Sequence, residues 1–107
     1  MVGLFAYNSP SCIDAIKEAG NLGTIKICGF DEQDALLQAI TDGHAYGTIS
    51  QQPWEYGYES IKMLKKILEG TQPENTYQEV SFLEVTQGNI GEFWAKKKEM
   101  AELGKSE

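Results

Sequence analysis

The sequence has little of what most catalytic and metal sites require. It contains one histidine, His44, and two cysteines, Cys12 and Cys28. Two cysteines form no disulfide framework, and their spacing matches no metal motif. A glycine-rich phosphate loop and a nucleophile elbow are also absent. We therefore expect no catalytic residues, no bound metal and no cofactor, and we predict that the protein is not an enzyme.

Basic residues are also scarce. The sequence has nine basic residues (lysine and arginine) and 16 acidic residues (aspartate and glutamate), so the formal net charge is -7. A chain of this charge repels phosphate backbones, and we expect no nucleic-acid partner. No apolar run approaches the ~18 residues that cross a bilayer, and the first residues lack the layout of a signal peptide. The expectation is that the chain carries no targeting segment of its own.

What is present is an alternation of strand and helix patterns. Short apolar or β-branched runs predict strands at residues 2–6, 24–30, 45–50 and 76–85, and helical spacing predicts helices between them. Such alternation is typical of an α/β fold with a parallel sheet flanked by helices on both faces. We predict a single α/β domain over residues 1–107, with a charged tail at 88–107 that is either helical or frayed.

Two of the predicted helices have clear signals. Leu36, Leu37 and Ile40 form a buried stripe, and Gly43 follows where a left-handed residue ends a helix. A longer helix is expected from about Trp54 to Glu69, with its apolar residues on one face. Ser9 followed by Pro10 predicts a cap and first turn for the first helix.

Polar side chains stand at the ends of three predicted strands: Asn8, Asp31 and Gln51. Ligands of open parallel sheets bind outside the carboxyl ends of the strands, so these side chains are expected at one edge. A carboxylate and two amides can satisfy the adjacent hydroxyls of a small sugar or polyol. For each residue alone, a role as a turn or helix cap explains the pattern equally well.

Aromatic residues accompany this edge, namely Phe5, Tyr7, Phe30 and Trp54. The C–H face of a sugar packs on such rings. A structural role, with Phe5 and Phe30 in the core and Trp54 as an anchor of its helix, is expected for at least two of these residues. Tyr7 or Trp54 is the candidate ligand contact.

Three stretches resemble the C-terminal third of ribose/galactose-type periplasmic binding proteins. They are Gly3–Asn8, Ile27–Asp31 and Asp42–Pro53, the last ending in a Thr-Ile-x-Gln-x-Pro motif. The resemblance runs from about Val2 to Gly70. It implies that Asn8, Asp31 and Gln51 contact sugar hydroxyls. Family members often have an acidic residue after that asparagine, whereas Ser9 stands here.

The resemblance also implies a two-lobed, periplasmic protein that delivers a sugar to the membrane subunits of an ABC transporter. Residues 54–87 are then the helix and strand that cross between lobes, and an N-terminal lobe is missing from this chain. A helix without that lobe is expected to pack on its own sheet or on a second copy, as a homodimer. Half a cleft is expected to bind sugar weakly.

Other interpretations remain open at this stage. The effector-binding domain of a lactose-repressor-type transcription regulator has the same fold, although the Thr-Ile-x-Gln-x-Pro ending favours the transport protein. A small flavodoxin-like enzyme or response regulator would need a phosphate loop or an acidic cluster after the first strand. A fragment with no function of its own is also compatible with the pattern.

Overall fold

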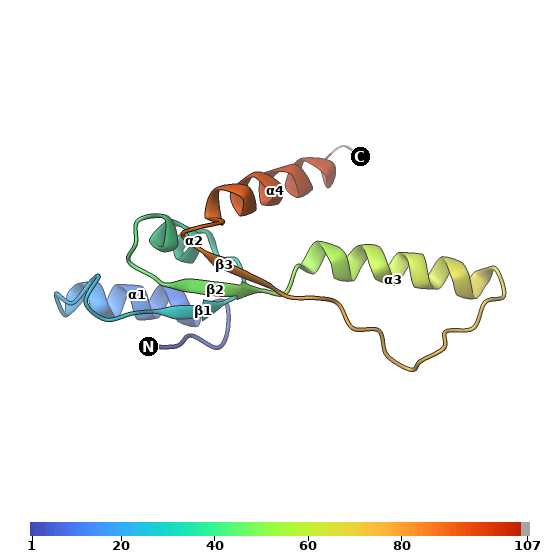
Figure 1. Cartoon of the computed structure of the whole chain (residues 1–107), viewed down its shortest axis with the longest axis horizontal. Helices are drawn as coiled ribbons and strands as arrows, with labels where there is room; N and C mark the ends of the chain where they lie inside the picture. Colours follow the sequence, from blue (N-terminus) through green and yellow to red (C-terminus); the bar gives the residue numbers. More distant parts are fainter. Residues whose placement is uncertain (106–107) are drawn as a thin grey trace. The chain divides into compact units, whose positions relative to one another are not determined.

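The computed structural model describes residues 1–105, which fall into two compact units (Figure 1). Met1–Ser50 and Leu83 onward form the first unit, and Gln51–Phe82 forms the second. The elements are α1 (Asn8–Glu18), β1 (Cys28–Phe30), α2 (Asp34–Thr41), β2 (Gly47–Ser50), α3 (Pro53–Leu68), β3 (Leu83–Thr86) and α4 (Ile90–Leu103). The predicted α/β class is confirmed, and the charged tail is helical over α4.

The sheet of the first unit has the order β1-β2-β3. β1 pairs with β2 in parallel, with Phe30 opposite Ile49. β2 pairs with β3 in antiparallel, with Ser50 opposite Leu83. The chain leaves the sheet after Ser50, at the carboxyl end of β2, and re-enters it opposite that residue, at Leu83. Because the chain returns at the same end of the sheet, β3 runs in the opposite direction to β2. The sheet is therefore mixed rather than wholly parallel.

All four predicted strands are shorter than the sequence suggests. β1 covers only the end of the range expected at 24–30, and β2 lacks the first two residues of the range expected at 45–50. Of residues 2–6, only Val2 forms a bridge, parallel to Cys28. Beyond it, the backbone turns early because Asn8 Oδ1 accepts a hydrogen bond from Phe5 N. The strand expected over residues 76–85 begins only at Leu83, where the chain returns to β2.

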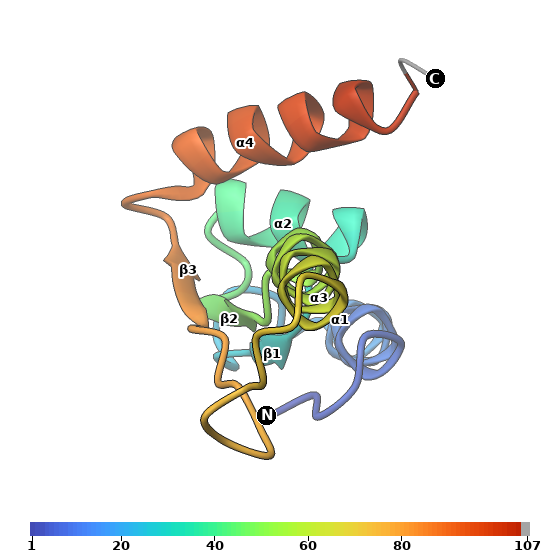
Figure 2. The ribbon, with the colours of Figure 1, turned by 90° about the vertical axis from the view of Figure 1, so that its right-hand side faces the viewer.

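The helices of the first unit form one layer, in contrast to the expected cover on both faces. α1 contacts α2, and α2 contacts α4 (Figure 2). Gly29 and its paired residue Thr48 face this layer and are buried. On the other face, Cys28 is exposed and Ile49 is half-buried. Among residues 1–50 and 83–105, no helix packs on that face of the sheet.

The core lies between the sheet and this helical layer. Leu36, Leu37 and Ile40 are fully buried, which confirms the stripe predicted for α2. Ile27 and Val85 are fully buried from the sheet side. Gly43 has φ 77°, so the left-handed end predicted for this helix is also confirmed.

A close contact fixes α1 against the sheet. Ser9, predicted to cap this helix, lies inside its first turn and is fully buried; Tyr7 is the capping residue. A Cβ atom added at Gly3 or at Gly29 would lie 2.5 Å from Ser9 Oγ. Only glycine at both positions lets the helix approach this closely.

Replacing Gly29 by alanine is expected to destabilise the first unit. The added Cβ would meet Ser9 Oγ and Leu36 Cδ2, each at 2.5 Å. Overpacking of this kind costs about 1–3 kcal/mol of unfolding free energy. Urea denaturation followed by circular dichroism measures the loss. Gly91→Ala is the matched control, because nothing lies within 4 Å of a Cβ at Gly91; equal stability of both variants would refute the expectation.

The second unit consists of α3 and the segment that follows it. α3 begins with Pro53 at its first turn, and none of its residues is buried. Tyr58, Ile61, Leu64 and Leu68 are exposed large apolar side chains of this helix. Among residues 1–105, no helix combines the length and apolar character of a bilayer span.

Candidate functional site

The carboxyl ends of β1 and β2 lie at the same edge of the sheet, because these neighbouring strands are parallel. Asp31 directly follows β1, and Gln51 directly follows β2. α1 begins at Asn8, and its next residue, Ser9, lies against Gly29, two residues before Asp31. The first unit thus brings Asn8 and Asp31 to one edge.

Asp31 is held in an unusual backbone conformation. Its φ is 68°, in the left-handed region that costs most residues energy and that aspartate tolerates better than most. Its backbone N donates to Ile49 O at 2.9 Å, and its carbonyl accepts from Thr48 Oγ1 at 2.8 Å. β2 therefore fixes Asp31 through both backbone groups, and the residue is half-buried.

A second carboxylate lies beside Asp31. Ser50 is fully buried, and its Oγ donates to Glu32 Oε2 at 2.7 Å. Neither Glu32 nor Ser50 is among the site residues predicted from the sequence. Glu32 follows Asp31, and Ser50 is the last residue of β2, so position at a strand end was the signal available for both.

Asn8 has a structural role as well as a candidate functional one. Its Oδ1 accepts from Phe5 N at 3.0 Å, and its own N donates to Phe5 O at 2.9 Å. The side chain therefore closes a turn, as the capping interpretation of the sequence allowed. Its Nδ2 makes no hydrogen bond within residues 1–105, so the amide retains a donor for a ligand.

The aromatic candidates differ in their surroundings. Tyr7 and Phe5 are both exposed, and their rings stack with centroids 5.9 Å apart and planes 4° apart. Phe5 is thus not the core residue expected from the sequence. Phe30 is half-buried at the end of β1, and Trp54 is half-buried in the first turn of α3.

Gln51 and Trp54 lie in the second unit, where Gln51 is exposed. Its neighbour Gln52 is buried, with φ 53° and ψ 64°. Gln52 Nε2 donates to Ser81 O at 2.9 Å, which ties the start of the second unit to its end. The sequence analysis missed this amide, because its partner is 29 residues away.

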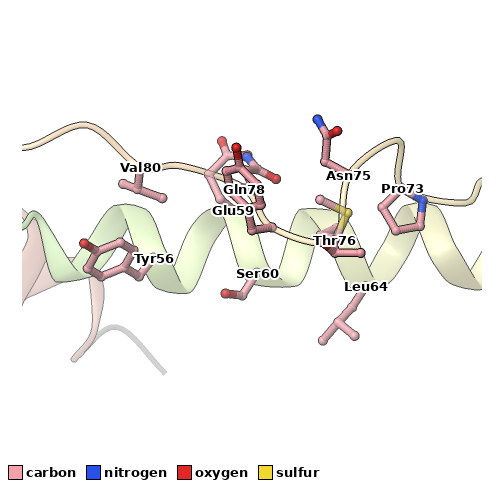
Figure 3. A pocket seen from close by; sticks show the side chains of 11 residues that line it. Tyr56, Glu59, Ser60, Leu64, Pro73, Asn75, Thr76, Gln78 and Val80 are labelled. Atoms are coloured by element: carbon pink, nitrogen blue, oxygen red, sulfur yellow. The ribbon is translucent and has the colours of Figure 1, made fainter.

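α3 and the segment after it enclose a hollow of 470 Å³ within the second unit (Figure 3). Its lining is mainly apolar, from Tyr56, Met63 and Leu64 on α3 and from Pro73, Tyr77 and Val80. At its polar side, Gln78 Nε2 and Lys62 Nζ both donate to Glu59. The bond from Lys62 holds the pKa of Glu59 below its usual value and raises the pKa of Lys62.

Comparison with solved structures gives a consistent set of proteins. An ABC transporter solute-binding protein from Agrobacterium vitis with bound D-fucose is 27% identical, with a TM-score of 0.76 over 89% of this chain and 32% of that protein. A glucose-galactose binding protein from Geobacillus stearothermophilus is 19% identical, with a TM-score of 0.75 over 82% of this chain and 31% of that protein. The chain therefore spans less than two thirds of each solved protein.

A further structure has the same fold. The solute-binding protein of an Actinobacillus succinogenes ABC transporter, solved with D-allose, is 17% identical, with a TM-score of 0.76 over 84% of this chain and 32% of that protein. No curated protein matches the sequence. A family model described as a periplasmic binding protein domain matches residues 1–72. This match covers more than half of the chain, which therefore belongs to the periplasmic binding protein domain family.

Proposed function

We propose that this chain supplies one side of the ligand cleft of a periplasmic solute-binding protein that takes up a sugar or polyol. The observation that carries the proposal is the fixed position of Asp31, at the carboxyl end of β1, in a chain of the periplasmic binding protein family. The solved neighbours with D-fucose and D-allose support a sugar as the ligand class.

The proposed roles follow from the chemistry of the side chains. Asp31 accepts hydrogen bonds from two adjacent hydroxyls, while the amides of Asn8 and Gln51 each donate to a sugar oxygen. Tyr7 and Trp54 are the candidates for packing on the apolar face of the ring. Tyr7 already has Phe5 stacked on one face, so only its other face serves a ligand.

The proposed partners extend beyond this chain. The apolar face of α3, with Tyr58, Ile61, Leu64 and Leu68, is the surface that we assign to the missing N-terminal lobe. In the isolated chain, the same face is available to a second copy. The whole protein would hand its sugar to the membrane subunits of an ABC transporter and would catalyse no reaction. The transport proteins among the neighbours favour this function over a repressor effector domain.

Titration with sugars, followed by amide NMR of the labelled chain, tests the proposal. We expect D-monosaccharides to shift the amides around Asn8, Asp31 and Gln51, with a Kd on the order of millimolar. Binding is weak because each net hydrogen bond contributes about 1 kcal/mol and only one wall of the cleft is present. Absence of any shift with a panel of hexoses and pentoses would refute sugar binding, and a submicromolar Kd would contradict the half-cleft interpretation.

A further inference from the structure

A lysine of α4 is bound to the segment that carries Asp31. Lys97 Nζ donates to the carbonyl oxygen of Glu32 at 2.6 Å and pairs with Asp34 Oδ1. These partners are 65 and 63 residues away in sequence. The ammonium also lies 5.5 Å from the centre of the Trp94 ring. The Lys97 side chain lies between Trp94 of α4 and this segment, and only 28% of it is exposed.

The segment from Asp31 to Asp34 connects β1 to α2, and its two ends are anchored differently. Asp31 is fixed by the backbone hydrogen bonds to β2, and α2 begins at Asp34. Between these ends, the Glu32 side chain accepts a hydrogen bond from Ser50 Oγ. The Glu32 carbonyl oxygen accepts one from Lys97 Nζ. The lysine thus holds the Glu32 carbonyl and the Asp34 side chain, two groups for which no bond to a strand is seen in residues 1–105.

We propose that Lys97 is a positioning residue for the ligand site. By binding Glu32 O and Asp34 Oδ1, it keeps the connection in the conformation that holds Asp31 at φ 68°, with its carboxylate set for a ligand. The inference rests on the proposed function for the role of Asp31. It makes α4 part of the site's scaffold, although the family match ends at residue 72.

The test compares Lys97→Gln with Lys98→Gln in the full chain. Both substitutions remove one positive charge from α4, but Lys98 is exposed and, within residues 1–105, makes no hydrogen bond or ion pair to residues 31–34. Amide hydrogen exchange measures local opening, and the amide of Asp31, which is hydrogen-bonded to Ile49 O, reports on the connection. The amide of Val85, in the buried core, reports on unfolding of the whole unit.

We expect Lys97→Gln to speed exchange at Asp31 by about tenfold or more, since it removes a hydrogen bond from a charged donor. Exchange at Val85 should remain unchanged, as should exchange at both Asp31 and Val85 in Lys98→Gln. Lys97→Arg should restore slow exchange, because a guanidinium can reach both oxygens. Asp34→Asn, a milder change that keeps the bond to Glu32 O, should give an intermediate rate.

Equal exchange in Lys97→Gln and Lys98→Gln would overturn the positioning role. An equal increase at Val85 would also overturn it, because the lysine would then stabilise the whole unit rather than the connection. If the unsubstituted chain binds no sugar while exchange still depends on Lys97, the proposed function fails and the positioning of the connection stands. Where sugar does bind, Lys97→Gln should also weaken its effect on the Asp31 amide.

Discussion

Replacing Asp31 by asparagine should raise the Kd for sugar by about tenfold or more, because a hydrogen bond to a charged group contributes about 1.5–3 kcal/mol. Asparagine has the same shape and tolerates the left-handed backbone, so the substitution removes charge without adding strain at φ 68°. NMR titration with the sugar that gives the largest shifts measures the change.

Asp14→Asn is the matched control for this experiment. Asp14 is exposed on α1, and its replacement makes the same change in net charge. We expect it to leave the Kd unaltered. If Asp31→Asn and Asp14→Asn bind sugar equally well, Asp31 is only the end of a strand and the assigned role is wrong.

The second large effect is expected at the exposed face of α3. The isolated chain should self-associate as its concentration rises, because Ile61, Leu64 and Leu68 are large apolar side chains of α3 that are more than half exposed. Leu64→Glu should abolish this association by placing a charge among these side chains. Sedimentation equilibrium over a range of concentrations measures the change in average mass.

Leu103→Glu provides the comparison. Leu103 lies at the end of α4 and is 59% exposed, close to the 56% of Leu64, so the same substitution tests a similar site on another helix. It should leave self-association intact. A chain that remains monomeric at every concentration, or one in which both variants dissociate equally, would contradict the assignment of the α3 face as a contact surface.

Sequence pattern predicts this fold well where the determining interactions are local. The stripe of Leu36, Leu37 and Ile40 follows from helical spacing, and the left-handed end at Gly43 follows from the absence of a side chain. The prediction of a strand over residues 2–6 was wrong beyond Val2. The turn closed by Asn8 takes up the Phe5 amide, which strand pairing would otherwise use. The direction of β3 depends on where the chain returns, which a local pattern does not encode.

The candidate site also contains residues that local sequence predicts and residues that it does not. Asp31 is identified by its position after a strand, and its backbone conformation adds to that identification. Glu32, Gln52 and Lys97 were missed because their partners lie 18, 29 and 63 to 65 residues away. The roles of Asp31, Asn8, Gln51, Tyr7 and Trp54 as ligand contacts stay predictions, as does the assignment of residues 54–87 to a crossing between lobes.

The pairing of Ser50 with Leu83 gives the first unit an unusual independence. In topological terms, β2 and β3 are the two arms of an ordinary β-hairpin, and the whole of Gln51–Phe82 occupies the place of its turn. The pairing of β2 with β3 and the hydrogen bond from Gln52 to Ser81 hold the two ends of the inserted segment together. The segment between them can therefore lengthen, shorten or diverge in the course of evolution without disturbing the edge that carries Asp31.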